Sequence, residues 1–140
     1  MLRFVLDIGM GLGYSAAVFS QLSEAVVAVE DDQTHFDEAS EALGDFGADN
    51  VIPHLGELAE GAAEHGPYDV ILIQGAVEHV PDTVLAQLKD GGKITCLFME
   101  GALGTVKIGY KFDGRTDWRA SFNAGAPILD GFQRHRAFTL

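Results

Sequence analysis

Short apolar runs alternate along this chain with segments in which apolar and polar residues recur at helical spacing. Uninterrupted apolar runs are typical of parallel strands covered on both faces, and the amphipathic segments are typical of helices. The predicted strands are residues 3–8, 25–29, 50–55, 68–74 and 93–98. The predicted helices are residues 14–22, 34–46, 57–64 and 81–88. Their alternation predicts a three-layer, Rossmann-like α/β fold, in which helices cover both faces of a mostly parallel sheet.

The last third of the chain has a different pattern. Residues 104–112 are predicted to form a strand, Asp113-Gly114 a turn, and residues 132–140 a final strand. We expect these two strands to pair antiparallel at the edge of the sheet, with an irregular segment over residues 118–127 between them. No repeat or linker interrupts the sequence, so we expect a single domain over residues 1–140.

The strongest signal for chemistry is a glycine-rich turn after the first predicted strand. The turn contains the glycines Gly9, Gly11 and Gly13. Backbone N–H groups can approach a ligand closely there, because glycine has no Cβ. The second predicted strand ends in Glu30, whose carboxylate is placed to accept both hydroxyl groups of a ribose. The alternatives are an ordinary tight turn for the glycines and a helix-start acid for Glu30, a role that fits Asp31 and Asp32 better.

The glycine spacing discriminates between nucleotide cofactors. A dinucleotide-binding fingerprint has glycines at relative positions one, three and six. The sixth position counted from Gly9 is Tyr14, which disfavours a nicotinamide dehydrogenase. The glycine turn preceded by Asp7 and followed by Glu30 resembles the first two motifs of class I S-adenosylmethionine-dependent methyltransferases.

Further motifs narrow the resemblance to one family. They are DIGMGLGYSAA at 7–17, GPYDVILI at 66–73, LKDGGKI at 88–94 and FNAGAPILDGF at 122–132. In this order they resemble the protein-L-isoaspartate O-methyltransferase family, and the likeness covers nearly the whole chain. The resemblance implies the class I methyltransferase fold and a carboxyl O-methylation that repairs L-isoaspartyl residues in damaged proteins.

The resemblance also implies a cofactor, S-adenosyl-L-methionine, with S-adenosyl-L-homocysteine as its product. The glycine turn would line the methionine part, Asp7 would reach its amino end and Glu30 would bind the ribose. Glu57, in Gly56-Glu57, falls where the family has an acid that contacts the adenine amine, although it also fits a helix N-terminal acid. The implied cofactor-binding residues are Asp7, Gly9, Met10, Gly11, Gly13, Tyr14, Glu30, Asp31, Gly56, Glu57 and Gln74.

The resemblance is weaker where the methyl acceptor would bind. Gln74, Gly75 and Ala76 follow the fourth predicted strand, where the family usually has Thr-Ala-Ala. These residues are our candidates for the active-site mouth, with a hydrogen bond to a neighbouring loop as the alternative role for Gln74. A carboxylate acceptor is ionised at neutral pH and needs no general base, so the sequence identifies no catalytic residue.

The family carries a helical segment before the first strand, with a loop that closes over the peptide. This sequence begins at Met1, shortly before its first predicted strand. We therefore expect weak methylation of an isoaspartyl protein or peptide partner, and exposed apolar surface that favours a homodimer or binds a hydrophobic dye. Two alternatives stay open, namely a methyltransferase for another small acceptor and a non-catalytic module that binds S-adenosylmethionine.

Composition excludes several partners. The net charge of −12 repels phosphate backbones, which argues against nucleic acid. No apolar run has the length of a membrane span. The single cysteine, Cys96, lies in an apolar run as a small core residue and fits a reducing cytoplasm, where we expect the protein. The five histidines show no metal-ligand spacing, with Cys96 or with one another, so we expect no metal site.

Overall fold

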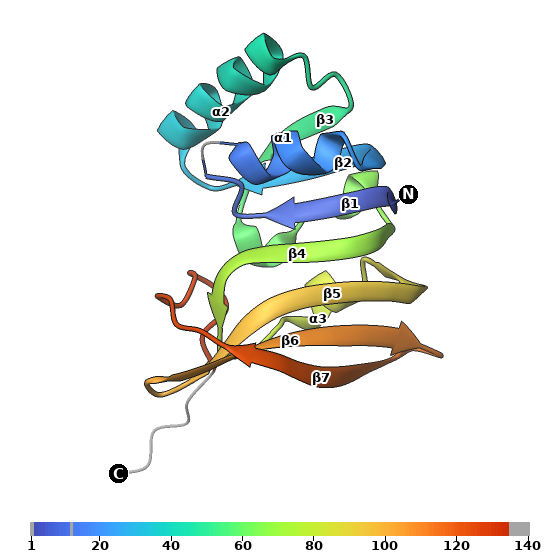
Figure 1. Ribbon diagram of the computed structural model, residues 1–140, viewed down its shortest axis with the longest axis vertical. Coiled ribbons are helices and arrows are strands. Elements are labelled where there is room, and N and C mark those ends of the chain that lie inside the picture. Colours follow the sequence, from blue (N-terminus) through green and yellow to red (C-terminus); the bar gives the residue numbers. More distant parts are fainter. Residues whose placement is uncertain (1, 12, 135–140) are drawn as a thin grey trace.

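The structure is a computed structural model that describes residues 2–11 and 13–134. In this part of the chain a seven-stranded sheet has the order β3-β2-β1-β4-β5-β6-β7 (Figure 1). The strands are β1 (Leu2–Ile8), β2 (Ser23–Glu30), β3 (Val51–Leu55), β4 (Tyr68–Val77), β5 (Leu88–Glu100), β6 (Leu103–Phe112) and β7 (Arg115–Asn123). Strands β1 to β5 pair in parallel, whereas β6 pairs antiparallel with both β5 and β7. The predicted mostly parallel sheet with an antiparallel edge strand is confirmed.

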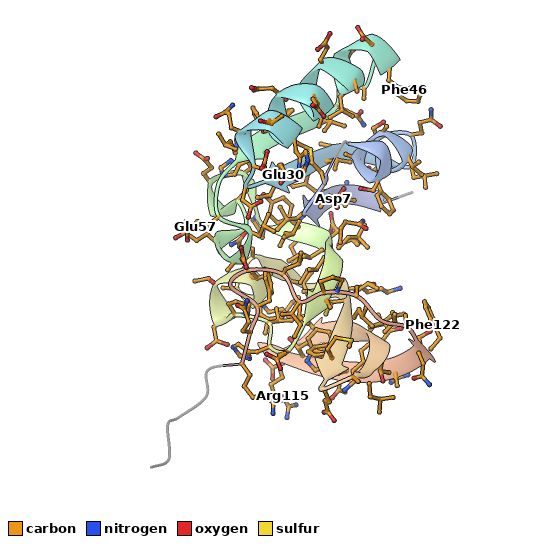
Figure 2. The ribbon with its side chains drawn as sticks, turned by 90° about the vertical axis from the view of Figure 1, so that its left-hand side faces the viewer. Asp7, Glu30, Phe46, Glu57, Arg115 and Phe122 are labelled. Atoms are coloured by element: carbon orange, nitrogen blue, oxygen red, sulfur yellow. The ribbon has the colours of Figure 1, made fainter. Side chains whose placement is uncertain are left out.

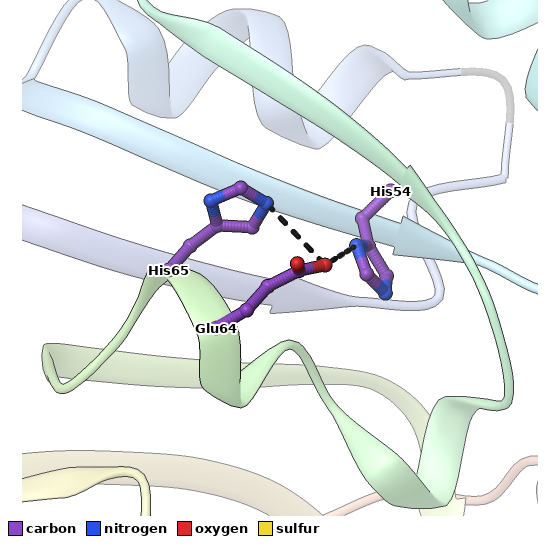
Figure 3. A group of neighbouring side chains, drawn as sticks. All are labelled: His54, Glu64 and His65. Carbon is purple, nitrogen blue, oxygen red and sulfur yellow. Dashed lines mark ion pairs between the residues drawn. The ribbon is translucent and has the colours of Figure 1, made fainter.

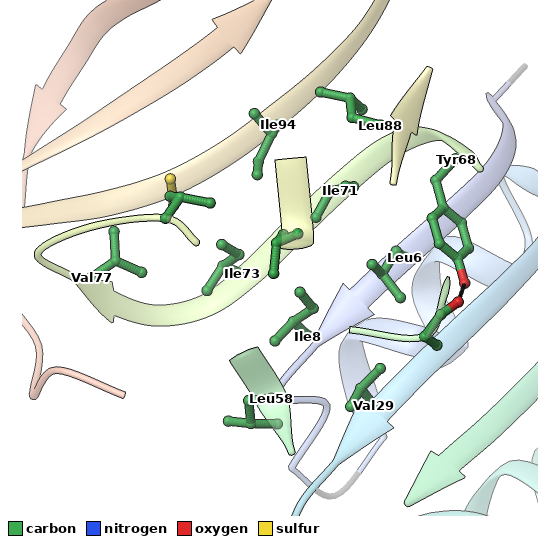
Figure 4. Close-up of a cluster of buried hydrophobic side chains, with 14 of the residues drawn as sticks. Leu6, Ile8, Val29, Leu58, Tyr68, Ile71, Ile73, Val77, Leu88 and Ile94 are labelled. Carbon is green, nitrogen blue, oxygen red and sulfur yellow. Dashed lines mark hydrogen bonds between the residues drawn. The ribbon is translucent and has the colours of Figure 1, made fainter. Parts of the chain in front are cut away.

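Helices cover the parallel half of the sheet on both faces. They are the α-helices α1 (Tyr14–Ser20), α2 (Gln33–Phe46) and α3 (Asp82–Leu85) and the 3₁₀ turns η1 (Leu58–Glu60) and η2 (Ala63–His65). On one face Ala16 of α1 and Leu43 of α2 share a buried cluster with Val5 of β1. On the other face Leu58 of η1 shares a second cluster with Leu6 of β1 (Figure 4). Val5 and Leu6 enter different cores because successive side chains of a strand point to opposite faces.

The edge of the sheet corrects one prediction. The strand that pairs with β6 is β7, which occupies much of the segment predicted to be irregular. Asp113 and Gly114 both have positive φ, as a two-residue type I′ hairpin requires, so the partner strand follows the turn at once. Trp118 of β7 points inward and packs edge-on against Phe98, with the ring centroids 4.9 Å apart. Of the predicted strand at 132–140, residues 132–134 are not in a strand, and 135–140 lie outside the described residues.

Several boundaries also differ from the prediction. The predicted helix 57–64 is the pair of 3₁₀ turns η1 and η2, and the predicted helix 81–88 is the short α3. The predicted turn at Asp90-Gly91-Gly92 is an irregularity inside β5, where the pairing register with β4 shifts. Gly47 ends α2 in the left-handed conformation.

Cys96 is buried, as predicted, and burial raises the pKa of its thiol to about 12. Among the described helices, none has both the length and the apolar character needed to cross a membrane.

Candidate functional site

The candidate site lies where the chain reverses its direction of travel across the sheet. From β1 the chain proceeds outward to β2 and β3, and then returns to β4 on the other side of β1. In open α/β sheets, ligands bind at such a switch point, beside the carboxyl ends of the strands. The glycine turn follows β1 and Gln74 lies near the end of β4, so these two predicted elements flank the switch point.

The glycine turn is held against β2 by its own backbone. The N–H groups of Gly9 and Met10 both donate to the carbonyl of Val29, at 2.9 and 3.0 Å. A Cβ on Gly11 would meet no atom within 4 Å among the described residues, whereas a Cβ on Gly13 would lie 3.3 Å from the Ala39 side chain. Gly11 therefore faces open space, and Gly13 permits close packing of the turn on α2.

Glu30 connects the end of β2 to this turn. Its side chain is only 5% exposed. Glu30 Oε2 accepts a hydrogen bond from the N–H of Gly11 at 2.9 Å, and Oε1 accepts from the N–H groups of Asp31 and Asp32 at 3.1 and 3.2 Å. Asp32 caps α2 by accepting from the His35 N–H, whereas Glu30 does not cap this helix. The helix-start role thus belongs to Asp32, as predicted.

Asp7 is a fully buried carboxylate on β1, beneath the turn (Figure 2). Its Oδ2 accepts a hydrogen bond of 2.7 Å from the hydroxyl of Ser15. Oδ1 is buried and has no hydrogen-bond partner among the described residues. Burial raises the pKa of Asp7, and the Ser15 hydroxyl and the nearby Gln74 amide oppose that rise. Asp7 therefore offers a vacant acceptor beside the turn. Ser15 does not cap α1, because its hydroxyl donates to Asp7 and no side chain caps that helix.

The candidate mouth is a bulged part of β4. Between Leu72 and Ala76 the pairing register with β5 shifts, which leaves Gln74 exposed. Gly75 is required here, because its φ is 153° and a Cβ would lie 2.6 Å from the Leu129 side chain. The segment after β7 returns to this point, where the N–H of Leu129 donates to the carbonyl of Ala76 at 2.9 Å. The fold thus brings the predicted mouth and the C-terminal motif together.

The remaining predicted residues lie along the same edge of the sheet. The N–H of Gly56 donates to the carbonyl of Glu30 at 3.1 Å, which fixes the segment after β3 beside the end of β2. Glu57 is exposed and makes no capping hydrogen bond with η1 (Figure 2). The Met10 side chain is buried in the core, so only its backbone faces the site. Tyr14 begins α1, and its side chain lies outside the described part of the structure.

The spacing of residues in the sequence did not predict one group of side chains, which lies next to Gly56. His54, Glu64 and His65 place their ligating atoms within 4.8 Å of one another. No local spacing could have revealed this group, because β3 and η2 meet only in the folded chain.

The comparisons with known proteins agree with this geometry. The family model described as protein-L-isoaspartate(D-aspartate) O-methyltransferase matches residues 2–102. This chain belongs to that family. The matched residues include Asp7, the glycine turn, Glu30, Glu57 and Gln74, whereas Leu129 lies outside them.

Relatives and solved structures of the protein-L-isoaspartate O-methyltransferase family cover different shares of the chain. Protein-L-isoaspartate O-methyltransferase 2 of Polaromonas sp. (strain JS666) is 41% identical over 90 residues, which are 64% of this chain and 43% of the relative. The Caulobacter vibrioides (strain NA1000) protein is 34% identical over 130 residues, 91% of this chain and 58% of its own. A solved protein-L-isoaspartate O-methyltransferase superposes with a TM-score of 0.85 at 29% identity and covers 93% of this chain and 42% of its own.

A Plasmodium falciparum structure, which was solved in complex with S-adenosyl-L-homocysteine, shares the fold. Its TM-score is 0.74 at 18% identity, over 92% of this chain and 66% of its own. The chain spans about half the length of the curated relatives it matches, from 37% to 58% in the first four.

Proposed function

We propose that this chain binds S-adenosyl-L-methionine at the strand-end site and serves the methylation of L-isoaspartyl carboxyl groups in damaged proteins. The observation that carries the proposal is the family match over residues 2–102. That range includes Asp7, the glycine turn, Glu30 and Gln74.

The residues at the site fit this cofactor. Asp7 Oδ1 is a buried acceptor without a protein partner among the described residues, and such an acceptor suits the ammonium group of a methionine moiety. The open side of Gly11 lets a ligand approach the backbone. Glu30 and Glu57 offer carboxylates for the ribose and the adenine amine. When bound, S-adenosylmethionine supplies a methyl group on a positively charged sulfur, which is already activated for transfer.

The chain's own residues then have to bind the cofactor, orient the acceptor carboxylate and exclude water. An acceptor carboxylate is ionised at neutral pH, so no side chain has to remove a proton. Positioning of two reactants contributes on the order of 7–11 kcal/mol to a reaction of this kind. Gln74, Gly75 and the Leu129 segment lie where the acceptor would enter, and we assign them this orienting role.

A second function is favoured by one observation at the mouth. Gln74-Gly75-Ala76 stands where the resemblance implies Thr-Ala-Ala. Gln74 is exposed there, on a bulge against which Leu129 packs. A different side chain here supports a methyl acceptor other than an isoaspartyl residue. A module that binds the cofactor without turnover is the third possibility.

Two measurements separate these functions. Calorimetric titration with S-adenosyl-L-homocysteine should show binding, and titration with NAD should show none. Transfer of labelled methyl groups should then modify an isoaspartyl peptide and leave the matched aspartyl peptide unmodified. Binding of S-adenosyl-L-homocysteine without methylation of either peptide would favour another methyl acceptor or the non-catalytic module. Absence of S-adenosyl-L-homocysteine binding would overturn the proposed function.

The proposed partner is an isoaspartyl-containing protein or peptide in the cytoplasm. The net charge of −12 argues against nucleic acid as a partner. Association of two copies is a further proposal, and it rests on an exposed apolar groove between α1 and α2.

A further inference from the structure

Two histidines and a glutamate from separate elements converge beside β3. His54 lies on β3, whereas Glu64 and His65 lie in η2 (Figure 3). The Oε1 atom of Glu64 is 3.4 Å from Nδ1 of His54 and 3.7 Å from Nε2 of His65. The two imidazole rings are nearly perpendicular, at 85°, with their centroids 5.9 Å apart. We call these three residues the His–Glu–His cluster.

The spacing of the cluster matches the coordination of a small transition-metal ion. Zinc binds imidazole nitrogen and carboxylate oxygen at about 2.0–2.2 Å, so neighbouring ligands in a tetrahedron lie about 3.3–3.5 Å apart. Two of the three ligand pairs are close to that separation, and all three lie within 4.8 Å. The Glu64 side chain is 67% exposed and can rotate toward an ion, and rotation of the two imidazole side chains would bring their nitrogens to the same distance.

The two elements that carry the cluster are fixed by buried contacts. His54 pairs with Val29 of β2 in the sheet. The residue before η2, Ala62, donates its N–H to Oε1 of Gln87 at 3.0 Å and accepts the Tyr68 hydroxyl at 2.5 Å. Burial raises the pKa of Tyr68, and the Glu64 carboxylate raises it further, so this hydroxyl stays protonated and keeps donating. The ligands are therefore presented from two rigid backbones.

Simple ion pairing explains the cluster less well. One carboxylate oxygen, Oε1 of Glu64, faces both imidazoles, and exposed pairs of this kind contribute little to stability. A divalent cation would instead be attracted by all three ligands and by a chain with a net charge of −12. The imidazole nitrogens select zinc, cobalt, nickel or copper over magnesium and calcium, which prefer oxygen ligands.

We propose that His54, Glu64 and His65 form a surface site for Zn²⁺ or a chemically similar divalent transition-metal ion. The ion links β3 to η2 and leaves at least one coordination position for water. The site lies behind Gly56, where an added Cβ would be 3.1 Å from Nε2 of His54. An ion bound there lies outside the proposed cofactor site, but it fixes the segment that continues into Glu57. The metal site does not depend on the proposed function.

The test uses the full chain without a histidine tag, stripped of metal and titrated with ZnCl₂ by calorimetry. The expected result is one ion per chain, a rise in the melting temperature, and no comparable binding of Mg²⁺. Cobalt provides a second readout, since a site with two imidazoles and a carboxylate gives a visible absorption spectrum.

Matched variants assign the ligands. His54→Ala and His65→Ala should each weaken zinc binding on the order of 100-fold, and Glu64→Gln, which keeps the side chain's size, should weaken it roughly tenfold or more. His79→Ala removes an exposed histidine elsewhere and should leave binding unchanged. The unligated melting temperature of each variant shows that it is folded. Absence of saturable zinc binding to the folded wild type would overturn the proposal, and so would a zinc affinity in His54→Ala and His65→Ala equal to that of the wild type.

Discussion

The carboxylate of Glu30 accepts a hydrogen bond from the backbone N–H of Gly11, at 2.9 Å, across the end of the sheet. This contact ties the tip of β2 to the most open residue of the glycine turn. Three backbone N–H groups donate to this carboxylate, which has about four acceptor positions. Glu30 therefore shapes the turn as well as offering a contact for a ribose.

Replacing Glu30 should consequently reduce both stability and affinity. Glu30→Ala removes the acceptor for three backbone donors, so we expect the free energy of unfolding to fall by about 1.5–3 kcal/mol. The affinity for S-adenosylhomocysteine should fall by a similar free energy, since a charge-assisted bidentate contact is lost. Urea unfolding and calorimetry measure the two effects. Glu38→Ala, at an exposed acid on α2 outside the proposed site, is the control for charge, and unchanged affinity in Glu30→Ala would refute the ribose assignment.

Two glycines of the turn should respond differently to alanine. Gly11 and Gly13 have φ of 56° and 87°, so alanine at either position is strained by roughly 1–2 kcal/mol. At Gly13 the new Cβ also presses on Ala39 at 3.3 Å, whereas at Gly11 it points into open space. Gly13→Ala should therefore lower the melting temperature more, and Gly11→Ala should lower cofactor affinity more relative to its loss of stability. The opposite ranking would show that Gly11 does not face the ligand.

Asp7 gives a prediction that depends on pH. Its pKa is raised by burial above the ordinary value of 3.8, so the folded state binds the proton more tightly than the unfolded chain does. The ionised carboxylate thus lowers stability above the raised pKa, and this penalty disappears as the pH falls through that pKa. We expect Asp7→Asn to stabilise the ligand-free protein at pH 7 by about 1 kcal/mol, and the advantage to shrink toward pH 4.

The same substitution should weaken S-adenosylhomocysteine binding, on the order of 10–100-fold, because a neutral amide replaces a charged acceptor for the ammonium group. Thermal unfolding at several pH values and calorimetry at pH 7 provide the two readouts. A variant that is less stable than the wild type at pH 7 would contradict the account of the buried charge.

Local signals predicted the half of the fold that carries the site. The glycine turn after β1 and the acid that ends β2 are each indicated by residues that are adjacent in the sequence. The β7 strand was missed although Asp113-Gly114 is a hairpin signal, because most exposed residues of β7 are polar and its aromatic contact with the core is that of Trp118 with Phe98.

Contacts between distant segments could not be read from the sequence. The bulge at Gly75 is explained by Leu129, which lies far along the chain. His54 and His65 approach each other only because Tyr68 and Gln87 hold η2 beside β3. Such contacts depend on tertiary packing, for which neither residue spacing nor hydrophobic period carries a local signal.

An apolar groove between α1 and α2 should bind a hydrophobic dye. It is lined by Gly13, Ala17, Val18, Gln21, Ala42, Leu43 and Phe46. Val18 and Phe46 are 43% and 56% exposed, and a contiguous apolar surface of this kind favours association. We expect Phe46→Gln to reduce both dye fluorescence and the mass measured by light scattering at micromolar concentration. Phe122→Gln, on β7, is the control for an exposed phenylalanine outside the groove. A dye-silent, monodisperse wild-type monomer would contradict this prediction.

Lys111 of β6 should contribute to stability through two carbonyl groups that the sequence does not point to. Its ammonium group donates to the carbonyl of Leu85, at the end of α3, at 2.9 Å, and to that of Leu88, at the start of β5, at 2.8 Å. Lys111→Met keeps much of the apolar stem but leaves both carbonyls without this donor. Hydrogen bonds to a charged group contribute about 1.5–3 kcal/mol, so the free energy of unfolding in urea should fall by about that amount. Lys107→Met, on the same strand, removes only a contact with the Phe98 ring at 5.1 Å and should cost less than about 1 kcal/mol. If the two variants were equally stable, Lys111 would not be what holds α3 against the antiparallel half of the sheet.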